Sequence, residues 1–290
     1  MKKGLKILMI GAHPDDNDIC GGGTALRYLE NGCRVRFLSV SDGRCGHHRL
    51  SPEETARRRK AETAAVAKLT GIEYDVWDVP DGEVTANLET RRRMIRYIRA
   101  YAPDVVFTHR TIDYHPDHRN ASLLVQDASY MLTVPNFCPE APAMRHMPVI
   151  MFFDDRFKNP VFVPDVVVAT DGVIDKKFEM YHCHTSQMYE WLAYTHGDEA
   201  LVPADPAKRL EWYRSPRIPR DRALTLAEIM PNVTNNHNEY REAIPAAKYR
   251  AELIKRYGKA GERIVFAEAF ALSEYGAQLT EEKIKRLFPL

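Results

Sequence analysis

Short apolar runs alternate with longer amphipathic segments through the first 153 residues of the chain. Apolar runs of the length expected for strands buried on both faces lie at 6–10, 35–40, 74–79, 104–108 and 149–153. Segments with helical spacing of apolar positions lie between them, at 24–30, 51–70, 88–101 and 120–131. This alternation predicts an α/β fold: a Rossmann-like, doubly wound and mostly parallel sheet with helices on both faces.

Local sequence signals are present near the beginning of two of these helices. Ser51-Pro52 predicts an N-cap followed by proline at the first helical position. The glycines at 21–23 lack the G-x-G-x-x-G spacing of a dinucleotide-binding loop. We therefore interpret them as allowing close packing where a loop enters the helix.

The pattern becomes weaker after residue 160. Short strands are predicted at 161–163 and 166–168, and helices at 176–192 and 247–257. Residues 200–245 are rich in Pro, Arg and Asn with little periodicity, which predicts a loop-rich C-terminal extension. Residues 262–272 suit either a strand or a helix. We expect a single domain, with a core over about 1–190 and a C-terminal elaboration over about 191–290.

Composition narrows the class of protein. The 290 residues are 44% hydrophobic and 28% charged, which is ordinary for a globular enzyme. The formal net charge of +1 gives no basic footprint for nucleic acid. The five cysteines are odd in number and scattered, which favours reduced thiols and a cytoplasmic protein. Because no run of about 18 apolar residues occurs, we expect no stable membrane insertion.

Two motifs rich in histidine and carboxylate residues each follow a predicted strand. They are Ala12-His13-Pro14-Asp15-Asp16 and Asp113-Tyr114-His115-Pro116-Asp117-His118. Catalytic zinc takes nitrogen and oxygen ligands from three residues and leaves one position open for water. One His-Pro-Asp tripeptide is usually a surface turn. Two such tripeptides at the carboxyl ends of neighbouring parallel strands instead predict a metal-dependent hydrolase.

These motifs resemble those of the PIG-L/LmbE-type deacetylases, which include N-acetylglucosaminyl-phosphatidylinositol de-N-acetylases. The resemblance is carried by residues 11–16, the glycines at 21–22 and residues 113–118. Weaker agreement comes from Arg59-x-x-Glu62, Pro80-Asp81-Gly82 and Cys183-His184-x-Ser186-Gln187. It thus extends through roughly residues 5–190.

The resemblance implies a metal site and a set of catalytic groups. His13, Asp16 and His118 would be the ligands of Zn²⁺, with Fe²⁺ or Mn²⁺ as alternatives for such donors. Zinc lowers the pKa of a bound water to ~7 and polarises a carbonyl. By the same resemblance, the general base would be Asp15, and the cationic group facing the oxyanion would be His115. Asp117 would orient that imidazole and raise its pKa.

Three further residues are candidate substrate contacts, namely Arg59, Asp113 and Asp42. Arg59 and Glu62, at i and i+3, also suit a surface ion pair. Asp113 either contacts substrate or lies behind a metal ligand. The loop that contains Asp42 either lines the mouth of the site or is solvated.

The sequence therefore favours a zinc-dependent de-N-acetylase that acts on a small N-acetylated sugar or glycoconjugate of the N-acetylglucosamine type. Two alternatives stay open. One is an amidase for another N-acyl or thiol-conjugate substrate, and the other is a sugar- or nucleotide-binding module without turnover. Proteins of this kind also occur as trimers or hexamers, so the resemblance allows a homo-oligomer.

Overall fold

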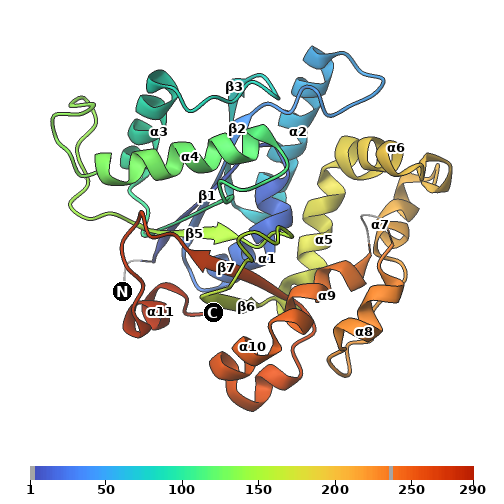
Figure 1. The fold of residues 1–290 in the computed structure, drawn as a ribbon. Coiled ribbons are helices and arrows are strands. Elements are labelled where there is room, and N and C mark those ends of the chain that lie inside the picture. The colour runs from blue at the N-terminus through green and yellow to red at the C-terminus, as the bar shows by residue number, and fades with distance from the viewer. Residues whose placement is uncertain (1–3, 235–237) are drawn as a thin grey trace.

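The computed structural model describes residues 4–234 and 238–290. At its centre is a seven-stranded sheet in the order β3-β2-β1-β4-β5-β7-β6 (Figure 1). The strands are β1 (Lys6–Gly11), β2 (Arg34–Ser41), β3 (Glu73–Val79), β4 (Val105–Thr108), β5 (Val149–Phe153), β6 (Val166–Ala169) and β7 (Ala267–Leu272). Strands β1 to β5 pair in parallel, and β7 pairs antiparallel with β5 and β6. The predicted mostly parallel α/β sheet is confirmed.

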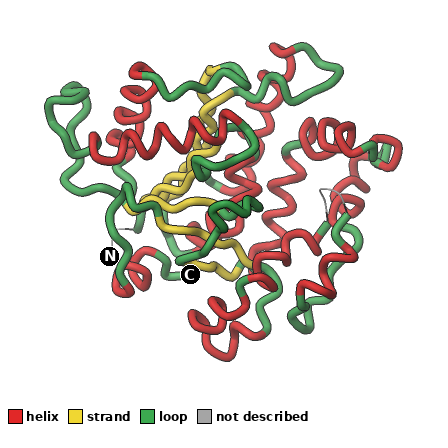
Figure 2. Tube along the Cα trace, in the orientation of Figure 1, coloured by secondary structure: helices red, strands yellow, loops and turns green. Residues whose placement is uncertain are grey.

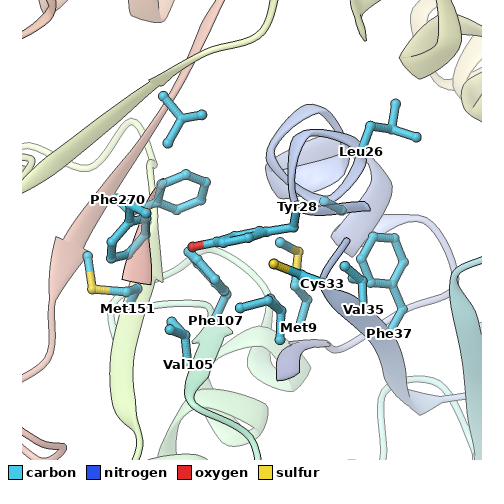
Figure 3. Close-up of a cluster of buried hydrophobic side chains, with 14 of the residues drawn as sticks. Met9, Leu26, Tyr28, Cys33, Val35, Phe37, Val105, Phe107, Met151 and Phe270 are labelled. Carbon is cyan, nitrogen blue, oxygen red and sulfur yellow. The ribbon is translucent and has the colours of Figure 1, made fainter. Parts of the chain in front are cut away.

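Helices cover both faces of this sheet (Figure 2). One face carries α3 (Leu88–Tyr101) and α4 (Pro116–Met131), and the other carries α1 (Asp16–Glu30), α2 (Pro52–Thr70) and α5 (Ile174–Cys183). Because side chains alternate along a strand, β1 contributes to both cores. Ile7 and Met9 pack with α1 and α2, and Leu8 and Ile10 with α3 and α4. Figure 3 shows Met9 in the first core, with the aromatic rings of Tyr28, Phe107 and Phe270.

Helix α1 begins at Asp16, earlier than the segment at 24–30 that the pattern predicts, and so includes the three glycines. A Cβ atom at Gly21 would lie 2.8 Å from Met9 Sδ, and one at Gly23 would lie 2.7 Å from Thr170 Cγ2. These distances leave no room for a side chain. The close packing predicted for these glycines is confirmed, but they lie within α1 and not where a loop enters it.

The predicted start of α2 is also confirmed. Ser51 Oγ accepts from the Glu54 backbone N–H at 3.3 Å, and the Glu54 carboxylate accepts from the Ser51 backbone N–H at 3.1 Å. This reciprocal capping box satisfies two backbone donors that the helix itself leaves unpaired. It fixes the direction in which the loop after β2 enters α2.

The C-terminal part differs from prediction in several places. Residues 161–163 form no strand and make a single bridge, between Lys158 and Val161, whereas 166–168 lie in β6 as predicted. The helix predicted at 176–192 is divided into α5, the π-helix η2 (Ser186–Trp191) and α6 (Leu192–His196). Of residues 262–272, for which either a strand or a helix is possible, residues 267–272 form the strand β7.

The loop-rich prediction for 200–245 is wrong over much of its described length, and residues 235–237 lie outside the described residues. That segment contains α7 (Pro206–Arg214), α8 (Leu226–Ile229) and the start of α9 (Glu239–Lys248). Side-chain caps explain α7 and α8, because Asp205 and Thr225 accept backbone N–H groups of their first turns. The remaining helices are η1 (Asp171–Val173), η3 (Glu199–Leu201), η4 (Met230–Asn232), α10 (Arg250–Tyr257), η5 (Gly258–Glu262) and α11 (Glu281–Leu287).

A buried ionic cluster joins this C-terminal part to the sheet. Lys177 of α5 is 2% exposed, and its ammonium lies 2.8 Å from Glu242 of α9 and 2.7 Å from Glu268 of β7. Glu268 also accepts from the backbone N–H groups of Gly23 and Thr24, at 2.8 and 2.7 Å. One cluster thus connects α1, α5, α9 and β7. Within the described ranges, no helix is both long and apolar enough to cross a membrane.

Candidate metal centre

The two motifs meet at the carboxyl ends of β1 and β4, which are neighbours in the sheet. Residues 12–15 follow β1 and lead directly into α1, whose first residue is Asp16. His115 is the N-cap of α4, and His118 lies in the first turn of that helix. The structure therefore brings the three predicted ligands together from two loops and two helix N-termini.

Three donor atoms form a nearly equilateral triangle. His13 Nδ1 lies 3.2 Å from His118 Nε2 and 3.4 Å from Asp16 Oδ2, and His118 Nε2 lies 3.4 Å from Asp16 Oδ2. Zinc bonds of ~2.0–2.2 Å in tetrahedral geometry place neighbouring ligand atoms ~3.3–3.5 Å apart. The spacing and chemistry of these donors therefore fit a zinc ion with one coordination position left open.

Carboxylates lie against the far nitrogen of each histidine. His13 Nε2 is 3.1 Å from Asp81 Oδ1 and 3.4 Å from Asp117 Oδ2, and His118 Nδ1 is 3.0 Å from Asp113 Oδ1. Burial disfavours protonated His13, but Asp117, Asp16 and Asp81 outweigh burial and raise its pKa well above the usual range. A site that stabilises this positive charge also favours a divalent cation, and the carboxylates orient the rings.

The Asp16 carboxylate has partners on several sides. Oδ2 accepts from the backbone N–H groups of Ala12 at 2.9 Å and His13 at 2.7 Å. Burial alone would raise the pKa of Asp16, but the His118 and His109 rings hold it well below its usual range. The group is therefore an anion, as a metal ligand must be.

Asp15 is the N-cap of α1, with a backbone φ of 141° that is rare for a residue with a side chain. It is 3% exposed, and burial raises its pKa to about 6, against the opposing effect of the Arg59 guanidinium. Arg59 donates to Asp15 Oδ1 at 2.8 Å and to the Pro14 carbonyl at 2.7 Å. Such strain is typical of a functional position.

Arg59 and Glu62 do not pair with each other at the surface. Arg59 is 2% exposed and is covered by the loop after β2, where a Cβ atom at Gly43 would lie 2.6 Å from Arg59 Nη1. Glu62 accepts from the Ser186 backbone N–H at 2.7 Å and from Thr185 Oγ1 at 2.9 Å. Both side chains therefore stabilise the region behind Asp15. Direct contact of Arg59 with substrate stays a prediction.

Two other candidate substrate contacts already have protein partners. The Asp42 carboxylate accepts from the Arg44 guanidinium at 2.6 and 2.9 Å. Asp113 Oδ1 lies against His118 and also accepts from the His115 backbone N–H at 3.0 Å. Of the two roles left open for Asp113, the geometry favours the position behind a metal ligand.

His115 and Asp117 are arranged differently from the expectation. The Asp117 carboxylate accepts from the Gly82 and Val84 backbone N–H groups, at 2.7 and 3.2 Å, and faces His13. Asp117 contacts His115 only through its backbone N–H, which donates to His115 Nδ1 at 3.2 Å. Burial and the two neighbouring histidines lower the pKa of His115 and outweigh the opposing effect of the Asp117 charge. The neutral ring therefore carries its proton on Nε2.

Sequence reasoning missed His109 and the role of Asp81. His109 is the first residue after β4, is 4% exposed and lies with its Nε2 3.2 Å from Asp16 Oδ2. It belongs to one of three overlapping groups of potential metal donors, with Asp16 and His118. Its position directly after a predicted strand, like that of His13, is the signal that could have found it.

This chain is similar in sequence to a known protein family and to proteins with assigned activities. Residues 8–129 match the PIG-L family, described as GlcNAc-PI de-N-acetylase. Diacetylchitobiose deacetylase from Thermococcus kodakarensis is 33% identical over 138 residues, which are 46% of this chain and 52% of that protein. The 4-oxalmesaconate hydratase of Pseudomonas putida is 25% identical over 241 residues, which are 79% of this chain and 91% of that protein.

A solved structure shows the same fold. The N,N'-diacetylchitobiose deacetylase from Pyrococcus horikoshii superposes with a TM-score of 0.63 at 21% identity, covering 94% of this chain and 85% of that one. The region matched to the family contains both His-Pro-Asp motifs and the strands that position them. Residues 8–129 of this chain are therefore similar to the PIG-L family, described as GlcNAc-PI de-N-acetylase.

Proposed function

We propose that this protein is a zinc-dependent hydrolase that removes the N-acetyl group of an N-acetylglucosamine-type sugar or glycoconjugate. The observation that carries this proposal is the triangle of His13 Nδ1, Asp16 Oδ2 and His118 Nε2, with sides of 3.2–3.4 Å. When bound there, a divalent metal would supply an acidified water and polarise the acetyl carbonyl. Zinc suits these donors, and Fe²⁺ or Mn²⁺ would suit them too.

Asp15 and His115 are the groups that would move or hold protons in this reaction. A carboxylate with a pKa of about 6 is mostly ionised at pH 7, so Asp15 can take a proton from the attacking water. It can then deliver that proton to the departing amine. The Nε2–H of neutral His115 can donate to the oxyanion that develops on the acetyl group.

Released amine is the direct test of this proposal. The purified protein would be freed of metal with a chelator, reloaded with zinc, and incubated with N-acetylglucosamine and N,N'-diacetylchitobiose. We expect amine release with zinc, loss of release after chelation, and recovery when zinc is restored. Full activity of the metal-free protein, or no release from either sugar with zinc, would contradict the proposal.

Hydration of an unsaturated carboxylic acid is a second candidate. It is favoured by one observation, the match to a hydratase over 79% of this chain. Hydration also needs a positioned water and a base, so the same residues would serve it. The two reactions differ in their products, because hydration releases no amine and removes a C=C bond. Loss of ultraviolet absorbance on incubation with 4-oxalmesaconate would identify this activity.

A further inference from the structure

His109 is a buried histidine that neither motif includes and that the proposed reaction does not use. Its ring lies parallel to that of His118, with centroids 4.0 Å apart and an angle of 13° between the planes. The His109 ring also contacts Phe153 of β5 in a T-shaped arrangement, with the ring centroids 5.6 Å apart. The ring is therefore fixed between the end of the sheet and a metal ligand.

The polar edge of this ring points to Asp16. Nε2 lies 3.2 Å from Asp16 Oδ2 and 3.2 Å from the backbone nitrogen of Ala12, which itself donates to the same carboxylate oxygen. Ala12 is immobilised in turn, because its carbonyl accepts from Ser41 Oγ at 2.9 Å. His109 thus completes a set of groups around the only carboxylate among the three proposed ligands.

We propose that His109 is a positioning residue that orients the Asp16 carboxylate and the plane of His118, and thereby sets the affinity of the site for zinc. This inference rests on the proposed metal site. Through Nε2, His109 limits rotation of the Asp16 carboxylate, and through its face it limits tilting of the His118 ring. Removing such a supporting group typically weakens metal binding 10–100-fold.

Two substitutions separate this role from simple packing. His109→Leu removes the polar edge and keeps a buried apolar side chain, whereas His109→Gln keeps an N–H group at about the position of Nε2. His146→Leu is the control, because His146 is exposed. The zinc dissociation constant of each full-length protein would be measured by competition with a chelator, alongside the melting temperature of its metal-free form.

We expect His109→Leu to bind zinc 10–100-fold more weakly, and His109→Gln and His146→Leu to bind it within about threefold of the original chain. Unchanged zinc affinity in His109→Leu would overturn the inference, as would equal weakening in the leucine and glutamine variants. If the original chain binds no zinc, the proposed function itself fails.

Cobalt substitution tests whether His109 is instead a ligand. The visible absorption of bound Co²⁺ depends on the number and type of its ligands. We expect the Co²⁺ spectrum of His109→Gln to match that of the original chain. A changed spectrum would assign His109 to the ligand set and overturn the positioning role.

Discussion

Asp15 combines three properties at one residue: burial, a backbone conformation with φ of 141°, and an ion pair with Arg59. Each of these properties is unfavourable or neutral for the stability of the fold, so none is expected at a loop residue without a function. Together they place a carboxylate with a pKa of about 6 next to Asp16, a proposed metal ligand. This is the pKa range in which a carboxylate can both accept and return a proton near neutral pH.

Asp15→Asn should abolish most of the activity and leave the metal in place. The amide keeps the size of the side chain and tolerates positive φ, but it cannot accept the proton of water. We expect kcat to fall 10²–10⁴-fold with an unchanged zinc content, measured by amine release and by metal analysis. Asp78→Asn, on an exposed carboxylate of β3, is the matched control and should retain full activity. Loss of zinc from Asp15→Asn would instead indicate that Asp15 supports the metal.

At the scale of residues, the sequence indicates which side chains belong to the site better than it indicates which groups they contact. The resemblance names His13, Asp16 and His118 as metal ligands, and the structure brings their donor atoms together, because residues that follow neighbouring parallel strands lie close to one another. The partners of Asp117 could not be found in this way. They are backbone N–H groups of residues 82 and 84, which reach it only through the turn after β3.

At the scale of elements, α1 links the metal centre to the C-terminal part of the fold. Its first residue is a proposed ligand, and its middle is packed so closely that glycine is required. The helix was predicted too short because glycine has a low helix propensity. Tertiary packing against Met9 and Thr170 overrides that propensity.

Gly23→Ala should therefore destabilise the protein although alanine favours helices. The added methyl would lie 2.7 Å from Thr170 Cγ2 and 2.9 Å from Glu268 Oε1. Overpacking of this kind costs about 1–3 kcal/mol. The midpoint of chemical denaturation should fall for Gly23→Ala. It should stay nearly unchanged for Gly172→Ala, whose methyl would have no neighbour closer than 3.9 Å.

Acid pH should weaken the contact that Asp175 of α5 makes with Arg214, the last residue of α7, and with Arg220 after it. Hydrogen bonds from Arg220 and Arg214 lower the pKa of Asp175 to about 2, below its unfolded value near 3.9. Because the folded pKa is lowered, this stabilisation is nearly complete above about pH 5 and is lost as the pH falls towards 2. The melting temperature of Asp175→Asn should therefore drop less than that of the original chain between pH 5 and pH 3. An equal drop would show that the pair contributes nothing to acid stability.

At the scale of the whole molecule, the C-terminal part contributes to the sheet and also covers one side of the fold. The strand β7 lies between β5 and β6, and α9 packs against it. The sequence pattern does not decide between strand and helix for residues 262–272, because strand pairing between segments distant in the sequence has no local signature. The same reason explains why 200–245 seemed loop-rich. Its helices depend on caps and on tertiary packing, of α7 against α5, of α8 against α9 and of α9 against β7.

Lys177 is the residue through which these distant parts depend on one another. Lys177→Met would leave Glu242 and Glu268 buried without their cation, and breaking a buried pair in this way costs about 3–5 kcal/mol. The double variant Lys177→Met with Glu242→Gln removes one of the two stranded charges and should recover part of this loss. Lys176→Met, at an exposed neighbour, is the control.

If chemical denaturation shows equal stability for the Lys177 and Lys176 variants, the cluster does not join the C-terminal part to the sheet. If instead only Lys177→Met is destabilised, and its zinc affinity also falls, then the cluster supports α1 and, through it, the position of Asp16.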